Sequence, residues 1–162
     1  MKQILFALIF CSLSSCQLFE PKPESEKFYC KLNGKAWRPE KGSYSLGTPL
    51  KGEWNRKGRF TIYAFSGKEL ITLSVKLNLN EPLMINKYTL SSIISETTGN
   101  YYYDQTVSSA ERLTSKNGVL NVTKIGSNQV SGTFEFTTRS NIQNKDYKIT
   151  KGQFNNLTYS AF

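Results

Sequence analysis

Histidine is absent from this 162-residue chain, which removes the commonest general base and the most frequent zinc ligand. Catalytic sites that pair serine or cysteine with histidine are therefore excluded. No Cys-x-x-Cys pattern stands in for histidine, no loop has calcium-ligand spacing, and no glycine-rich loop has the form that holds phosphate. The sequence predicts no catalytic residue, no metal site and no cofactor.

Cysteine is scarce, with three in the chain, and one of them lies in a recognisable setting. Lys2 and the apolar run from Ile4 to Phe10 have the pattern of a secretory signal, too short to span a bilayer. Leu13-Ser14-Ser15-Cys16 resembles the lipobox of bacterial lipoproteins. The resemblance implies cleavage before Cys16, diacylglycerol on its sulfur and a further acyl chain, such as palmitate, on the new N-terminus.

Three segments follow from this reading. Residues 1–15 are the signal peptide, and residues 16–27 are a polar tether, interrupted by Pro21 and Pro23, that cannot build a core. Residues 28–162 form a single β domain. With lipid on Cys16, Cys30 has no disulfide partner, and its apolar neighbours favour a role as a small buried hydrophobe.

Acidic residues are also in the minority, 12 against 21 Lys and Arg, for a formal net charge of +9. Loss of Lys2 with the signal leaves +8. The basic residues are spread along the chain, and an exported protein does not meet nucleic acid, so a nucleic-acid partner is not expected. Anionic glycans remain possible partners.

Alternation of apolar and polar residues with a period of two dominates the domain, most clearly from Ile71 to Leu79. No window shows sustained helical periodicity. The pattern predicts an all-β fold, an antiparallel sandwich or barrel of about eight to ten strands. Residues 40–58 read as irregular, residues 108–117 have room for one helical turn, and a bulge is expected near Gly152. The expected strands are 28–32, 35–38, 59–65, 71–79, 86–91, 101–107, 119–125, 130–137 and 147–159.

Three motifs occur in an order that resembles a family of Bacteroidota lipoproteins with no established activity. An N-G-K-x-W hairpin runs from Asn33 to Trp37, G-T-F-x-F from Gly132 to Phe136, and I-T-x-G-x-F from Ile149 to Phe154. The resemblance covers essentially the whole domain and implies a β-rich exported fold without catalytic residues. The family often has Asn where this chain has Lys151.

Aromatic residues are abundant, with 9 Tyr and 10 Phe. The run Tyr101-Tyr102-Tyr103 must point rings to both faces of a strand. Exposed rings with a polar tip bind sugars or proteins, although Tyr is also an ordinary residue on half-buried sheet faces. The candidate ligand contacts are Trp54 and Tyr102, with Arg56 and Arg59 assisting on anionic ligands.

Two functions remain open. The first is a non-enzymatic binding module on a lipid tether, with a glycan or another envelope protein as its partner. The second is a structural envelope protein without a small ligand. A hydrolase is the least favoured, because glycoside hydrolysis needs a carboxylate pair and Glu135 lies on a solvated strand face. In having Gln17 directly after the anchor, the chain resembles lipoproteins that are sorted to the outer membrane. The sequence leaves open which side of that membrane the domain faces.

The anchor can be tested by Cys16→Ala. Two or three acyl chains, each contributing about 0.8 kcal/mol per buried CH₂, make release from the membrane negligible. We expect the wild-type protein in the membrane fraction and the variant in the soluble fraction after export. An exported Cys16→Ala protein that still sediments with membranes would contradict lipidation at this residue.

Overall fold

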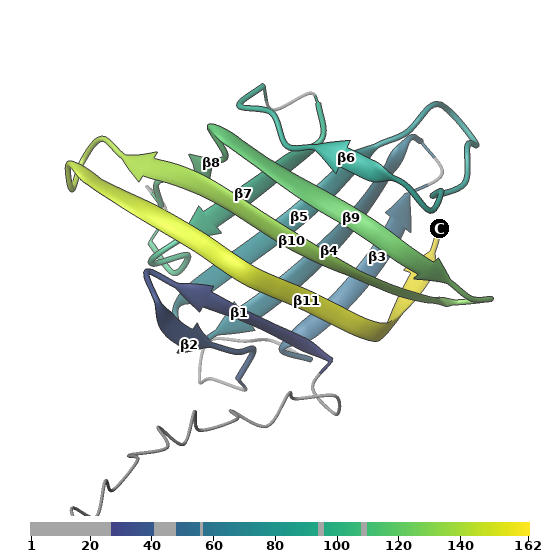
Figure 1. Ribbon diagram of the computed structural model, residues 1–162, viewed down its shortest axis with the longest axis horizontal. Coiled ribbons are helices and arrows are strands. Elements are labelled where there is room, and N and C mark those ends of the chain that lie inside the picture. Colours follow the sequence, from purple (N-terminus) through teal and green to yellow (C-terminus); the bar gives the residue numbers. More distant parts are fainter. Residues whose placement is uncertain (1–26, 41–47, 56, 94–95, 108–109) are drawn as a thin grey trace, which may run out of the picture.

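The computed structural model describes residues 27–40, 48–55, 57–93, 96–107 and 110–162, and within these ranges the chain is all β. The predicted fold class is confirmed. No helix in the described ranges is long and apolar enough to cross a membrane. The strands (Figure 1) are β1 Phe28–Leu32, β2 Lys35–Trp37, β3 Leu50–Asn55, β4 Arg59–Ser66, β5 Glu69–Lys76, β6 Lys87–Thr89, β7 Thr98–Tyr102, β8 Leu113–Thr114, β9 Asn117–Ile125, β10 Gln129–Ser140 and β11 Lys145–Ala161.

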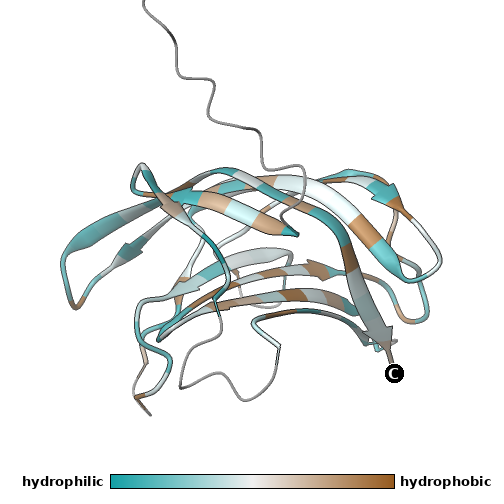
Figure 2. Cartoon of the chain, turned by 90° about the horizontal axis from the view of Figure 1, so that it is seen from below, coloured by the Kyte–Doolittle hydropathy of each residue, from teal (hydrophilic) through white to brown (hydrophobic). Residues whose placement is uncertain are grey.

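These strands form one curled sheet in the order β6-β9-β10-β11-β3-β4-β5-β7-β8, with the β1–β2 hairpin joined to β11. The sheet folds over into a half-barrel of two facing layers (Figure 2). β11 belongs to both layers, because its first part pairs with β10 and its end pairs with β3. The β11–β3 pair is parallel and makes the sheet mixed, whereas the sequence patterns suggested antiparallel strands throughout.

Local turn chemistry explains several of the strand connections. Asn33 and Gly34 have φ of 49° and 82°, the two left-handed residues of a type I′ turn between β1 and β2. Several elements differ from the sequence prediction. The strand expected at 101–107 is β7, Thr98–Tyr102, and the strand expected at 71–79 ends at Lys76, which leaves Leu79 exposed. β3 lies in the segment read as irregular, because Gly52 and the charged Lys51 and Glu53 obscure its alternation. Leu113–Thr114 pairs with β7 as a short strand and does not form the helical turn considered there.

β11 contains the predicted bulge. Phe134 pairs with Gly152 and Phe136 with Ile149, so two residues of β11 face Glu135 of β10. Lys151 sits in this bulge with φ of 52°. A β-bulge of this kind bends the strand and redirects a side chain.

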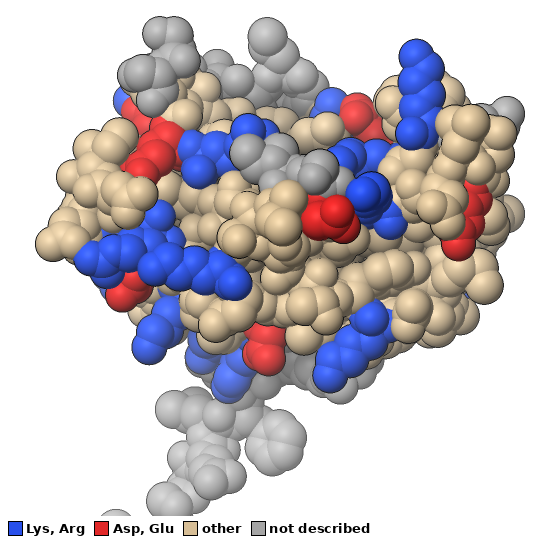
Figure 3. Space-filling view, turned by 90° about the horizontal axis from the view of Figure 1, so that it is seen from above, with Lys and Arg blue, Asp and Glu red and all other residues tan. Residues whose placement is uncertain are grey.

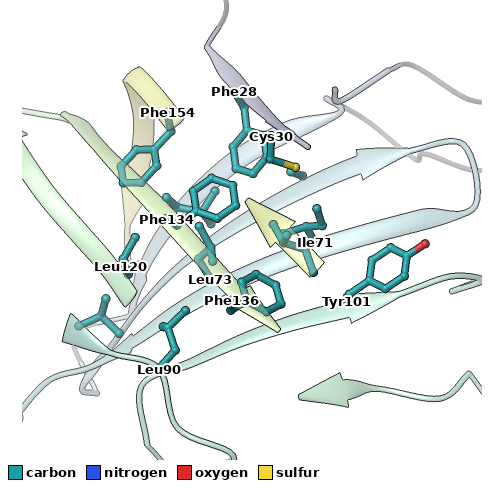
Figure 4. Close-up of a cluster of buried hydrophobic side chains, with 14 of the residues drawn as sticks. Phe28, Cys30, Ile71, Leu73, Leu90, Tyr101, Leu120, Phe134, Phe136 and Phe154 are labelled. Carbon is teal, nitrogen blue, oxygen red and sulfur yellow. The ribbon is translucent and has the colours of Figure 1, made fainter. Parts of the chain in front are cut away.

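The core between the layers is a cluster of buried apolar and aromatic side chains (Figure 4). Several of its phenyl rings lie directly against glycines. Gly132 pairs with Phe154, and Phe134 pairs with Gly152, so the two strands exchange ring and glycine reciprocally. An added Cβ at Gly132 would stand 2.5 Å from Phe154 Cζ, and one at Gly152 would stand 2.6 Å from the Phe134 ring. The rings therefore lie directly on neighbouring backbone.

Alanine at either glycine should destabilise the fold. A Cβ at Gly132 would also lie 2.3 Å from the Asn121 carbonyl oxygen, which cannot move without breaking the β9–β10 ladder. Overpacking of this kind typically costs about 1–3 kcal/mol, measurable by chemical denaturation of the full chain. Gly126→Ala is the matched control, since its nearest contact would be 3.8 Å. Equal stability of Gly132→Ala and Gly126→Ala would refute the packing argument.

Candidate functional site

The residues proposed from sequence as ligand contacts do not converge. Cys16 and Arg56 lie outside the described residues. Trp54, on β3, pairs with Phe60 and packs against the hydrophobic core. Arg59 pairs with Asn55, one residue further along β3, so its side chain lies on the opposite face of the sheet from Trp54.

Tyr102 shares the outer face with Arg59 but lies far from it. Tyr102 pairs with Leu70, which pairs with Phe65, at the opposite end of β4 from Arg59. Six residues along a strand span about 20 Å. Burial raises the pKa of Tyr102, and the nearby Arg112 opposes that rise. The three described candidates are thus not brought together on one surface, and their role in binding stays a prediction.

A groove of about 520 Å³ lies on the outer face of the other layer, across β6, β9, β10 and β11. The cross-strand register places Lys87 beside Asn121, Asn121 beside Thr133, and Thr133 beside Gln153. Val119 and Gly152 contribute apolar surface to the lining, and Glu135 and Lys151 complete it. Four strands spaced about 4.8 Å apart make the groove roughly 14 Å across.

The polar side chains of this groove are available to a ligand. Within the described part of the chain, none of the six makes a hydrogen bond, an ion pair or an aromatic contact. They offer amides, a hydroxyl, two ammonium groups and one carboxylate, which together can donate and accept hydrogen bonds. The six are Lys87, Asn121, Thr133, Glu135, Lys151 and Gln153.

Lys151 occupies its place in the groove at a conformational cost. The other non-glycine residues with positive φ in the described chain are all asparagine: Asn33, Asn80, Asn144 and Asn156. Asparagine tolerates the left-handed region, whereas a long side chain is strained there. Strain of this kind often marks a functional position.

A second cluster of polar groups surrounds Glu69, and the Glu69 carboxylate has its hydrogen-bond partners within the protein. Glu69 precedes Ile71 on the core-facing side of β5, and its carboxylate accepts hydrogen bonds from Trp37 Nε1 at 2.7 Å and from the Tyr101 hydroxyl. The Tyr101 hydroxyl points away from the aliphatic cluster (Figure 4). Burial, followed by the hydrogen bond and charge of Glu69, raises the pKa of Tyr101. These bonds join β2, β5 and β7 at one end of the half-barrel.

Cys30 is fully buried, as the sequence predicted. Burial, with a smaller contribution from the charge of Glu69, raises the pKa of its thiol from 9.0 to about 12. The thiol is therefore protonated at neutral pH and is a poor nucleophile or metal ligand. In the described ranges no three His, Cys, Asp or Glu residues are grouped so that they could hold a metal ion.

Charge on the surface forms no single basic patch in the view of Figure 3. Lys and Arg stand at several separate places there, with Asp and Glu among them. Several of the charges are paired, for example Lys76 with Glu96 at 3.1 Å and Arg139 with Asp146 at 3.0 Å. Exposed pairs of this kind contribute little to stability.

One known family model matches nearly all of the described chain, including the strands that form the groove. The model for a domain of unknown function, DUF6252, matches residues 27–158. The chain belongs to the DUF6252 family. No curated protein and no solved structure matches it. The matched residues of this DUF6252 domain include all those that line the groove.

Sequence reasoning recognised the groove residues of the DUF6252 domain only as the polar faces of separate strands. The sequence predicts a solvated face for Glu135, and Glu135 is exposed, as is Thr133 on the same face of β10. The sequence did not show which strands are neighbours in the sheet, and this order is what brings the groove residues together. One signal of this pairing was present in the sequence. When the two strands run antiparallel, Gly132 and Phe134 of the G-T-F motif fall opposite Phe154 and Gly152 of the G-x-F motif. That match would have placed Thr133 beside Gln153.

The thiol of Cys30 predicts a loss of stability at high pH. Above pH 9 the unfolded chain releases the thiol proton while the folded chain retains it, so stability falls as pH rises towards 12. Between pH 8 and 10.5 the wild type should lose about 2 kcal/mol more than Cys30→Ala, measured by denaturant unfolding. Parallel pH profiles for the two proteins would contradict the raised pKa.

Proposed function

We propose that this protein is a non-enzymatic binding module of the cell envelope, held on a membrane by lipid at Cys16, and that the groove across β6, β9, β10 and β11 binds a glycan. The observation that carries the proposal is the groove itself. It gathers six polar side chains that make no hydrogen bonds within the described chain. A volume of about 520 Å³ falls in the range of small-molecule sites.

The chemistry of the lining supports a glycan as the ligand. Sugar hydroxyls both donate and accept hydrogen bonds, as do the Asn121 and Gln153 amides and the Thr133 hydroxyl. These three side chains form one continuous row over adjacent strands. A protein partner would need a larger apolar surface at its centre, and among the residues that line the groove only Val119 presents an apolar side chain on the outer face.

The N-terminal pattern supports the proposed location. A signal segment and lipobox followed by a polar tether would display the domain at a membrane of the envelope, with the outer membrane favoured by Gln17. In that setting glycans are abundant ligands. A structural role without a ligand remains the alternative, and it predicts that the groove can be altered without loss of any binding.

The groove can be tested by binding measurements on the full chain in non-ionic detergent, against a panel of envelope polysaccharides immobilised on a glycan array. Asn121→Ala and Gln153→Ala each remove one hydrogen-bonding side chain, and Thr133→Trp fills the groove from an exposed position. Losing one hydrogen bond should weaken binding about two- to tenfold, and Thr133→Trp should abolish it.

Controls separate this site from others. Gln129→Ala removes an exposed amide at the far end of β10 and should leave binding unchanged. Binding that survives Thr133→Trp but is lost in Trp54→Ala and Tyr102→Ala would overturn the groove as the site. An array with no signal for the wild-type protein would overturn glycan binding and favour the structural role.

A further inference from the structure

We infer that the groove selects acidic glycans, whose sugar units carry spaced carboxylates, an inference that rests on the proposed function. Two lysines stand at opposite sides of the groove, Lys87 on β6 and Lys151 on β11. Three strand spacings separate them, about 14 Å between backbones. Two lysines on strands so far apart suit charges spaced along an extended chain better than one compact anion.

The carboxylate of Glu135 narrows the ligand class further. Glu135 is exposed on β10, between the strands that carry the two lysines, and it makes no ion pair with either in the described chain. A fixed negative charge there repels a continuous polyanion such as polyphosphate or nucleic acid. It can accept hydrogen bonds from hydroxyl groups. The lining therefore fits a ligand that alternates hydroxyl-rich and anionic positions.

Recognition of neutral sugars often depends on an exposed aromatic ring that stacks against the sugar face, and the groove lining has no such ring. Phe134 is the one aromatic residue in its lining, and only 3% of Phe134 is exposed because its ring packs against Phe28 and Phe154. No residue in the groove lining thus offers an exposed ring to a sugar face; Tyr29, opposite Gln153 on the neighbouring β1, lies outside the lining with its ring under the Arg38 guanidinium. Hydrogen bonds and charge must supply the affinity in its place, which makes an acidic ligand the better match.

Lys151 supplies the independent argument for charge. Its φ of 52° places a long side chain in a conformation that, among the described residues, is otherwise adopted by asparagine and glycine. The backbone alone would accommodate asparagine there with less strain. The ammonium group at this position accordingly contributes to something other than folding, and the bulge that causes the strain also brings Lys151 into the groove lining.

The test is calorimetric titration of the full chain in non-ionic detergent with a short linear oligogalacturonate and with its full methyl ester, which has the same rings without the charges. We expect the acid to bind about tenfold more tightly than the ester. Raising the salt concentration should weaken binding of the acid and leave the ester unaffected.

Variants assign the effect to the two lysines. Lys87→Gln and Lys151→Asn should each weaken acid binding about three- to fivefold. Lys151→Asn should at the same time raise Tm by about 3 °C, because it relieves the left-handed strain. Weaker binding together with higher stability is a result that a merely structural lysine would not produce. Lys116→Gln, an exposed lysine outside the groove, is the matched control.

Three results would overturn the inference. Equal binding of acid and ester would remove charge selection while leaving the groove as a glycan site. Acid binding that is unaffected by Lys87→Gln and Lys151→Asn would place the charge recognition elsewhere. A lower Tm in Lys151→Asn, alongside weaker binding, would make its role structural. Failure of the proposed function itself is distinguished by an array without signal for any glycan.

Discussion

The reciprocal contact between phenylalanine and glycine across β10 and β11 is the constraint on which this half-barrel depends. Phe154 covers Gly132, Phe134 covers Gly152, and the ring of Phe136 covers Gly99 on the facing layer. Each ring occupies space that any Cβ would block, so the register of the strands is strongly specified. A slip by one residue would turn every ring to the other face of the sheet.

The outer groove is a consequence of this inner packing. Because Gly132, Phe134, Gly152 and Phe154 are paired on the core side, the residues between them are paired on the outside, and Thr133 meets Gln153. β9 and β6 extend the same row. The bulge at Lys151 then adds a charged side chain to the lining of the groove.

Polar groups inside the half-barrel contrast with those of the groove. Glu69 is held by Trp37 and Tyr101, and the buried thiol of Cys30 keeps its proton, so both contribute to the fold and neither is left with unused chemistry. The outer groove shows the reverse, with hydrogen-bonding side chains that make no side-chain bond within the described chain. The unpartnered polar side chains of the proposed site therefore lie on the outer face of the sheet and not between its layers.

The sequence by itself determined most of the strands, the turn at Asn33-Gly34, the burial of Cys30 and the two faces occupied by Tyr101 and Tyr102, because alternation and turn preference are local properties. Only the tertiary structure decided which strands are neighbours, including the parallel β11–β3 pair. It separated Trp54, Arg59 and Tyr102, and it assembled the groove from residues between 87 and 153. Alternation shows on which face a side chain lies, but strand order depends on how all the apolar faces pack together.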